Sequence, residues 1–383
     1  MSNQTIGKLD MRQDRRDSDG AENRLWSIDL FRGVVMFLLI GEATGLYELL
    51  VSPALNGSII HSIGLQFQHH PWHGLTLWDL GQPFFMLISG VAMVFSYEKR
   101  WERGESWGTT LGHAGRRSFV LFVLGWALSH ISPMEGGGKG EFLLDILPQL
   151  AFASLLAFLL LRRPVRVQVG LALGLVVLTE LLYRLWPVPG FDQPFIPGHN
   201  FGSYVDSVLF GQLSEGNWVA FNIVPAAAHT IIGVLAGRLL RSGKSRAQKL
   251  KILVWTGLSG VAAGLALDPL TPIVRRICTS SFVIVTGGLG LLALALAYWL
   301  IDVVMIRKGA VFFVSVGMNP IFIYLFALSG GGDWFRRIVE PFMVGFSGWM
   351  GDLPAQALTS LVILGLLWAL CYWLYRRKIF IKI

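Results

Sequence analysis

Long apolar runs alternate with short polar segments along most of the chain. A helix needs about 20 apolar residues to cross the roughly 30 Å of hydrocarbon in a bilayer. The pattern therefore predicts an all-α, polytopic membrane protein with about ten transmembrane helices. Gly and Pro within several runs leave the ends of these helices uncertain by a few residues. The predicted spans lie at roughly 30–50, 76–97, 117–132, 143–161, 166–185, 219–240, 251–267, 280–301, 310–328 and 357–375.

Composition agrees with lipid as the solvent of this chain. Hydrophobic residues make up 53% of the sequence and charged residues only 15%, which leaves too little polar surface for a water-soluble globule. Residues 1–25 are polar and lack the apolar centre of a signal peptide. We therefore predict a polar cytoplasmic tail over 1–25 and a single transmembrane domain over 26–383. With Cys278 and Cys371 as the only cysteines, a disulfide framework and a cysteine-rich metal site are excluded.

The basic residues are distributed unevenly between alternate segments. If the N-terminus is cytoplasmic, 25 of the 32 Lys and Arg residues fall on the inner side, six on the outer side and one, Arg32, within the first span. The positive-inside rule then predicts that both termini are cytoplasmic and that residues 51–75, which contain no Lys or Arg, face outward. The same rule explains the net charge of +8, so no nucleic-acid surface is needed. The sequence shows no obvious internal repeat, which disfavours a transporter built from inverted repeats.

Ionisable residues within the predicted spans are candidates for function, because a charge in hydrocarbon is costly. Asp29 and Arg32 are three residues apart in "SIDLFRG" and share a helix face. They form either an ion pair that fixes the depth of the helix or a pair that orients a polar group inside the bundle. Glu180 and Arg184, at i and i+4, are predicted to pair locally.

Three histidines precede the second span in "FQHHPWHGLTLWDLGQPFFMLISG", residues 67–90. His69 and His73 have the i, i+4 spacing of a helical metal site. Pro71 disfavours a regular helix between them, and no glutamate or cysteine accompanies them. Asp79 follows His69 by ten residues and could hold the tautomer of a histidine that acts as base or nucleophile.

The same stretch has a simpler explanation as a loop at the membrane surface. Trp72 and Trp78 are typical of the aromatic belt at that depth. Thr76 and Asp79 fit a helix cap, and Pro83 is predicted to kink the helix that follows. A metal site, an interfacial loop and a catalytic histidine therefore all remain open from the residues alone.

Two further polar residues lie within apolar runs. His229 is in "PAAAHTIIGVLAG", where small residues permit close helix packing, and Asn319 is in "GMNPIF" beside a helix-breaking proline. Each can hydrogen-bond a neighbouring helix, and together they indicate a polar interior.

Five ordered motifs resemble the membrane-bound acetyltransferases typified by heparan-α-glucosaminide N-acetyltransferase and its bacterial relatives. They extend over about 350 residues, so their order is more specific than any single motif. The matching stretches are "RLWSIDLFRG", "HHPWHGLTLWDLGQPFFMLISG", "NWVAFNIVPAAAHTIIGVLAG", "PIVRRICTSSFVIVTGG", and "GMNP" with the final "LYRRKIFIKI".

This resemblance implies an acyltransferase that moves an acetyl group from cytoplasmic acetyl-CoA to an amino sugar or glycan on the outer side. The family's active-site histidine falls on His69 and its essential aspartate on Asp79. No metal is implied. The expected partners are the lipid bilayer, the small-molecule donor and the sugar acceptor, not nucleic acid, with a homodimer left open. The expected location is a bacterial inner membrane. We expect substrate-binding contributions from Asp29, Arg32, His73, His229, Ser281 and Asn319.

Several positions depart from the family's pattern and put the acceptor in doubt. His73 stands where the family has Asn, and Gln82 where it has Phe. Glu42 lies where an Asn is usual, Gln149 lies in a segment where the family tends to show Gln-Arg, and Arg275 replaces Lys. An amino-sugar transporter remains the alternative function, since a transporter also needs a polar interior. A structural protein that has lost the chemistry is disfavoured because His69 and Asp79 are both present.

Overall fold

The computed structural model describes residues 25–131 and 141–381, and within these ranges the chain is helical. Its β-structure there is an isolated antiparallel bridge between His73 and Val274. The all-α prediction is confirmed, while the predicted tail lies outside the described residues except for Leu25. The α-helices are α2 (Trp26–Glu42), α3 (Leu46–Leu50), α4 (Ile59–Leu65), α5 (Gly81–Glu102), α6 (Trp107–Ile131), α7 (Ile146–Leu160), α8 (Val165–Leu185), α9 (Phe201–Phe210), α10 (Ile223–Arg241), α11 (Arg246–Leu267), α12 (Ser280–Tyr298), α13 (Ala310–Gly317), α14 (Pro320–Phe326), α15 (Gly332–Ser347) and α16 (Asp352–Arg376).

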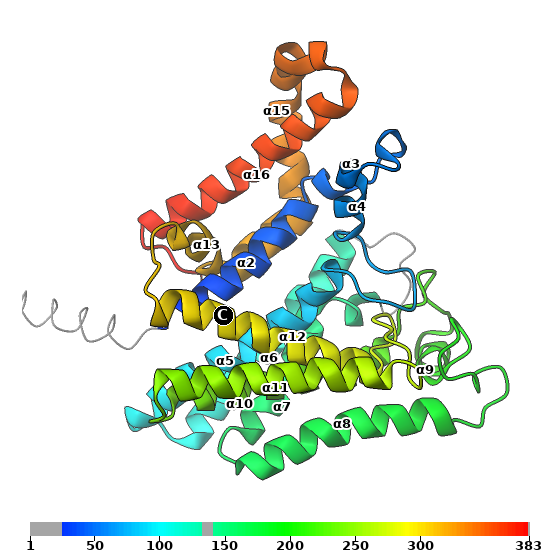
Figure 1. The fold of residues 1–383 in the computed structure, drawn as a ribbon, viewed down its shortest axis with the longest axis vertical. Helices are drawn as coiled ribbons and strands as arrows, with labels where there is room; N and C mark the ends of the chain where they lie inside the picture. The colour runs from blue at the N-terminus through cyan, green and yellow to red at the C-terminus, as the bar shows by residue number, and fades with distance from the viewer. Residues whose placement is uncertain (1–24, 132–140, 382–383) are drawn as a thin grey trace, which may run out of the picture.

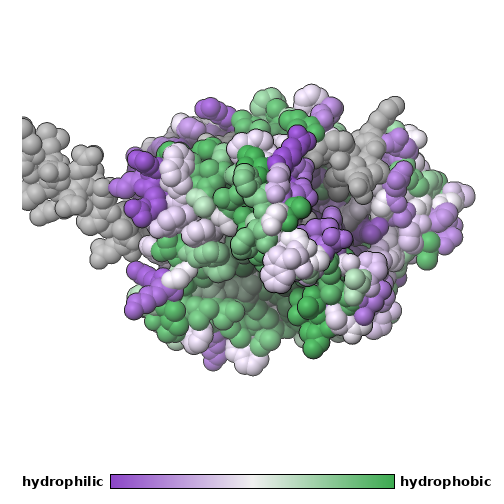
Figure 2. All heavy atoms as spheres, turned by 90° about the horizontal axis from the view of Figure 1, so that it is seen from above, coloured by the Kyte–Doolittle hydropathy of each residue, from purple (hydrophilic) through white to green (hydrophobic). Residues whose placement is uncertain are grey.

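Six helices in the described ranges are long and apolar enough to cross a membrane, which confirms a polytopic membrane protein. A bent pair, α13 with the segment Pro320–Met350, makes a seventh span if it is counted as one. The sequence predicted about ten transmembrane helices. The remaining predicted spans form helices that are short, such as the 17 residues of α2 and the 15 of α7, or less apolar, such as α6. Seen from above, hydrophobic residues form broad patches between hydrophilic residues gathered toward the two ends (Figure 2).

The first predicted span, 30–50, is wrong in its bounds. The helix begins earlier, at Trp26, and ends at Glu42. Gly45 then adopts the left-handed conformation with φ 69°, which glycine tolerates and a helix does not, and the short α3 follows it.

Proline determines two further departures from the predicted spans. The ninth predicted span is broken, because Asn319 is non-helical and Pro320 begins α14. The resulting bend between α13 and Pro320–Met350 is 75°. The kink predicted at Pro83 is absent, since α5 begins at Gly81 and the proline therefore lies in its first turn, where proline is tolerated.

Close helix contacts organise the interior. A Cβ on Gly90 of α5 would lie 2.1 Å from the Thr230 carbonyl oxygen, and a Cβ on Gly233 of α10 would lie 2.0 Å from that of Leu87. Any larger side chain would therefore push α5 and α10 apart. This agrees with the close packing predicted for the small residues around His229.

The loops that precede α5 and α12 meet at one end of this bundle (Figure 1). The His73–Val274 bridge joins them, and the Gly74 N–H donates to the Ile273 carbonyl at 2.9 Å. The fold thus brings together two segments about 200 residues apart in sequence, one of which carries His69 and Asp79.

Candidate active site

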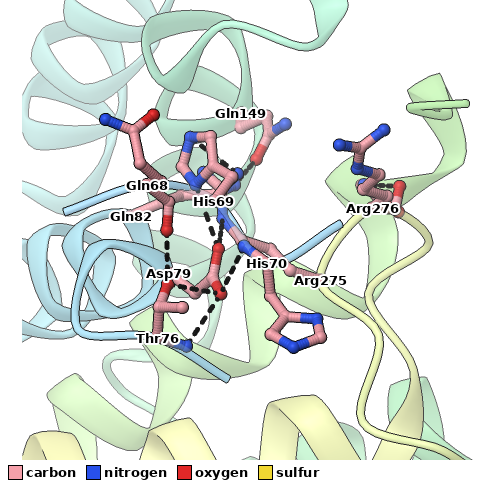
Figure 3. A network of polar contacts seen from close by, with 10 residues as sticks. Gln68, His69, His70, Thr76, Asp79, Gln82, Gln149, Arg275 and Arg276 are labelled. Atoms are coloured by element: carbon pink, nitrogen blue, oxygen red, sulfur yellow. Dashed lines mark hydrogen bonds and ion pairs between the residues drawn. The ribbon is translucent and has the colours of Figure 1, made fainter. Parts of the chain in front are cut away.

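His69 and Asp79 are in direct contact. His69 Nδ1 lies 3.0 Å from Asp79 Oδ1, and the two side chains face each other from the loop after α4 and the turn before α5 (Figure 3). The Asp79 side chain is fully buried, whereas that of His69 is 33% exposed. The arrangement is a carboxylate that orients an imidazole, and the imidazole remains accessible.

Local hydrogen bonds fix the Asp79 carboxylate. Its Oδ2 accepts from the Thr76 N–H at 3.0 Å, from Thr76 Oγ1 at 2.9 Å and from the His70 N–H at 3.3 Å. Thr76 and Asp79 are thus in contact, but they do not form the predicted helix cap, because the residue before α5 is Leu80 and no side chain caps that helix. His70 contributes its backbone, while its ring points away from the carboxylate (Figure 3).

Arg275 contacts the other face of this pair. Its Nη1 lies 3.2 Å from His69 Nε2, and its Nε lies 3.7 Å from Asp79 Oδ1. The guanidinium also lies over the Trp218 ring, 4.5 Å from the centroid, and the His69 ring meets the same indole edge-on at 5.4 Å. Because a guanidinium only donates, His69 Nε2 must be the acceptor and Nδ1–H the donor to Asp79.

The electrostatic environment keeps His69 neutral. Burial is the larger cause and the Arg275 charge the next, and together they lower the pKa of His69 to about 4 against the opposing effect of Asp79. Burial lowers the pKa of Arg275 to about 10, so the guanidinium remains protonated at neutral pH. The resting site therefore pairs a neutral imidazole, whose lone pair is on Nε2, with a cation.

The loop that carries Arg275 is held by its own hydroxyl groups. Thr279 Oγ1 accepts from the Val274 N–H at 3.0 Å and donates to the Pro272 carbonyl at 2.8 Å. Cys278 completes the turn at φ 50°. Ser281 Oγ lies 3.2 Å from Thr279 Oγ1, so this predicted substrate residue contacts the loop that positions Arg275.

Helix α8 anchors both ends of the same loop. Glu180 Oε1 accepts from Thr271 Oγ1 at 2.6 Å, and Glu180 Oε2 accepts from Ser280 Oγ at 2.7 Å. Arg184 pairs with Glu180, as the i, i+4 spacing predicted. The Glu180 carboxylate thus ties α8 to the segment that carries Arg275.

His69 opens into a cavity of about 320 Å³. Its wall combines one cation, Arg275, with two acids, Glu42 and Asp145, while Gln82 bonds Gln149 beside it. Asp145 is held in place, since its two oxygens accept from the Tyr324 hydroxyl at 2.8 Å and the Leu147 N–H at 2.7 Å. The full lining is Leu39, Glu42, His69, Trp78, Gly81, Gln82, Leu128, Ser129, Leu144, Asp145, Ile146, Arg275, Tyr324 and Leu328.

None of the six predicted substrate-binding residues lines this cavity, and four of them bond other parts of the described fold. His73 Nε2 lies 2.9 Å from Asp268 Oδ1 on an exposed face. His229 is buried between α10 and α12, with its ring nitrogens 3.1 Å from the Ala226 carbonyl and 2.8 Å from Thr286 Oγ1. Asn319 Nδ2 donates to the Ile379 carbonyl at 2.9 Å, and Ser281 contacts Thr279 as described. In each case the observed hydrogen bonds hold loops or helices together.

Asp29 and Arg32 form the predicted ion pair, with Arg32 Nη1 3.9 Å from Asp29 Oδ1. Arg32 also lines a second, smaller cavity of about 110 Å³, together with Ser89 and Arg117. This pair is therefore separate from the His69 cavity but borders a polar space of its own.

Arg275 and Glu42 entered the sequence analysis only as departures from the family's pattern, although each carries a further signal. Arg275 and Arg276 form a basic pair in a segment predicted to face outward, where basic residues are few. Glu42 is a lone carboxylate at the end of an apolar run. Asp145 and Tyr324 gave no such signal, because only the fold brings them near His69. In the described ranges, no group of three or more His, Cys, Asp or Glu residues is arranged to hold a metal ion.

Comparison with known proteins gives a consistent family assignment. Residues 24–266 match the family described as "Heparan-alpha-glucosaminide N-acetyltransferase, catalytic". The human heparan-alpha-glucosaminide N-acetyltransferase is 25% identical over 94% of this chain and 60% of its own length, and the mouse protein is 23% identical over 94% and 61%. The chain thus spans about three fifths of the length of these relatives. The family match includes His69 and Asp79 and ends before the Arg275 loop.

A family match over more than half of the chain, together with the motifs around His69 and Asp79, settles the classification. The chain belongs to the family of the heparan-alpha-glucosaminide N-acetyltransferase catalytic region.

Proposed function

We propose that the protein is a membrane-bound acetyltransferase that moves an acetyl group from acetyl-CoA to an amino sugar or a glycan carrying one. The observation that carries this proposal is the His69–Asp79 pair, 3.0 Å apart, at the wall of a cavity large enough for a small molecule. Family membership supports acetyl transfer as the chemistry.

His69 Nε2 is the reacting atom in this proposal. With Nδ1–H bonded to Asp79, Nε2 carries the lone pair that takes the proton of an acceptor amine. The amine nitrogen attacks the thioester carbonyl carbon, the carbon–sulfur bond breaks, and His69 returns its proton to the departing thiolate. In the two-step variant, Nε2 itself attacks the thioester and carries the acetyl group until the amine displaces it. Asp79 stabilises the positive charge that the imidazole gains in either route.

Arg275 must withdraw from Nε2 before His69 can react, because the two nitrogens are 3.2 Å apart at rest. A neutral base at rest is useful, since a protonated imidazole could neither accept a proton nor attack a carbonyl. The displaced guanidinium then donates to the oxygen that becomes negative as the thioester is attacked. Arg275 thus keeps the base neutral first and stabilises the transition state afterwards.

Glu42 is the proposed recognition group for the acceptor amine. Its side chain is exposed and borders the same cavity as His69. Asp145 adds a second acidic side chain, fixed by Tyr324. A carboxylate hydrogen-bonds an ammonium or amine more strongly than it does a neutral group. The acidic wall therefore favours amino sugars over neutral sugars.

The proposed orientation has the donor arriving from the cytoplasm and the acceptor from the outer side of a bacterial inner membrane. Its support is the excess of Lys and Arg, 25 against six, on the side opposite the His69 loop. Asp29 and Arg32 are kept as proposed substrate contacts because Arg32 lines the second cavity, beside Arg117. Guanidinium groups suit the phosphates of coenzyme A.

The proposal is tested with purified protein in detergent, radiolabelled acetyl-CoA and a panel of amino and neutral sugars. We expect label on amino sugars and no label when the protein carries Asp79→Asn. The same protein in proteoliposomes should take up no unmodified amino sugar. Uptake without acetylation would contradict the proposal and establish a transporter instead.

A further inference from the structure

A third space in the molecule is apolar and shares no lining residue with the His69 cavity. It is a groove of about 770 Å³ between α8 and α11, with α10 and α12 as its floor. Val169 and Leu173 of α8 face it from one side, and Ile252 and Thr256 of α11 from the other. The two helices stand apart at this place in Figure 1.

Helix packing explains why the groove exists. Glycines bring α11 against α12, since a Cβ on Gly260 would lie 3.1 Å from Gly288 Cα, and one on Gly288 would lie 2.6 Å from the Val261 nitrogen. Helix α8 instead packs on α10 and α12. Of the apolar stretches of α8 and α11, only 28% and 17% are buried within the described molecule. The groove between them therefore opens toward the bilayer.

The depth of the groove matches one leaflet. Its lining residues on α8 run from Val165 to Val176, a rise of about 16 Å at roughly 1.5 Å per residue. This is close to half of the approximately 30 Å hydrocarbon core. A chain that enters at the membrane surface beside Val165 thus finds apolar walls down to about the middle of the bilayer.

The mouth of the groove is positively charged. Arg238 and Lys244 line it at the turn between α10 and α11, and no Asp or Glu is among the residues that form it. Arg238 Nη1 donates to the Arg163 carbonyl at 2.9 Å, and Lys244 is exposed. Basic residues are common at membrane surfaces, but here they lie at the open end of an apolar groove one leaflet deep.

We propose that this groove is a binding site for an anionic phospholipid, with acyl chains between α8 and α11 and the phosphate held by Arg238 and Lys244. Both parts of the ligand are matched, the apolar part by the depth and lining of the groove and the anionic part by the charge at its mouth. The bound lipid fills the space between two helices that do not otherwise support each other there. Because Glu180 of α8 holds the Arg275 loop, the lipid also steadies a helix on which the His69 site depends.

The test uses purified full-length protein in a neutral detergent, titrated with phosphatidylglycerol or phosphatidylcholine of the same acyl chains. Native mass spectrometry counts the bound lipid, and thermal unfolding reports its effect on stability. We expect phosphatidylglycerol to bind more tightly and to raise Tm. Lys244→Gln should weaken phosphatidylglycerol about fivefold, since each basic residue near an anionic lipid is worth roughly 1 kcal/mol.

Two matched tryptophan variants separate the groove from the general lipid-facing surface. Thr256→Trp fills the groove and should abolish the tightly bound lipid. Leu258→Trp, on an exposed position of α11 outside the lining, should leave it unchanged. Lys308→Gln is the matched control for charge, because Lys308 is exposed and distant in sequence from the groove. Equal affinity for the two lipids, or undiminished binding by both Thr256→Trp and Lys244→Gln, would overturn the proposal.

Discussion

Replacing Arg275 with glutamine should move the pH dependence of acetyl transfer. Arg275 Nη1 is 3.2 Å from His69 Nε2 in the resting site. Burial and this guanidinium, in that order, lower the pKa of His69 to about 4, and Asp79 acts in the opposite direction. Glutamine removes the positive charge and leaves Asp79 in place, so the balance shifts toward the protonated imidazole.

The size of the change in the pKa of His69 follows from the 3.2 Å distance between Arg275 Nη1 and His69 Nε2. A charge within about 4–6 Å typically shifts a pKa by about 1–3 units. Loss of Arg275 should therefore raise the pKa of His69 to about 5–7. The neutral form is the reactive one, and it predominates above the pKa. Wild-type transfer should accordingly persist down to about pH 4, whereas a variant with a pKa of about 6 retains only about a quarter of its His69 neutral at about pH 5.5.

The assay is kcat/KM for acetyl transfer from about pH 4.5 to 8. Arg275→Lys keeps the charge, so the fall of kcat/KM on the acid side of the pH profile (the acid limb) should lie close to that of the wild type. Arg276→Gln is the matched control, since Arg276 also lowers the pKa of His69 but is its smallest cause, and it should shift the limb less. If the acid limb of Arg275→Gln coincides with that of the wild type, Arg275 does not control the protonation of His69.

Three further predictions test other parts of the account. Glu42→Gln should lower kcat/KM for amino sugars by about 10- to 150-fold, because a charge-assisted hydrogen bond is worth about 1.5–3 kcal/mol. Glu48→Gln, at an exposed position outside the cavity, should not lower it; equal effects of the two substitutions would remove Glu42 from acceptor binding. Asp29→Asn and Arg32→Gln should each lower the free energy of unfolding in detergent, and the double variant should lose about 1 kcal/mol less than the sum of the two single losses. If the losses simply add, the side chains that lie 3.9 Å apart do not stabilise each other. A cysteine introduced at Ser58 should react with an impermeant maleimide in intact cells, whereas one introduced at Ser245 should not. The two native cysteines are buried and should not contribute to the labelling. The reverse labelling pattern would invert the proposed orientation.

The helices were largely predictable because their signal is local. The spans predicted at 76–97 and 219–240 correspond to helical stretches at Trp78–Glu102 and Ala220–Arg241, since an apolar run of about 20 residues leaves few alternatives in a membrane. Bounds failed where a single residue changes the backbone direction. Gly45, in a left-handed conformation, lies between the end of the first helix at Glu42 and the start of α3, and Pro320 begins a new helix within the ninth predicted span.

The site was only half predictable, and the reason is distance along the chain. His69 and Asp79 are ten residues apart, and their pairing was expected from the motif that contains both. Arg275 is 206 residues from His69 in a loop without periodicity, so nothing local indicates the contact. His73 was expected to contact the substrate, but it bonds Asp268, 195 residues away, and so connects two loops. Nothing local in the sequence indicates this contact either.

The measurement that tests the central claim most directly compares acetyl transfer by His69→Ala and His73→Ala, each matched for folded protein. His69 faces the cavity and Asp79, whereas His73 lies on an exposed face against Asp268. A general base or acyl carrier contributes about 10²–10⁴-fold in rate, so His69→Ala should lose nearly all transfer while His73→Ala keeps most of it. Near-normal turnover by His69→Ala would contradict the assignment of His69 as the catalytic group.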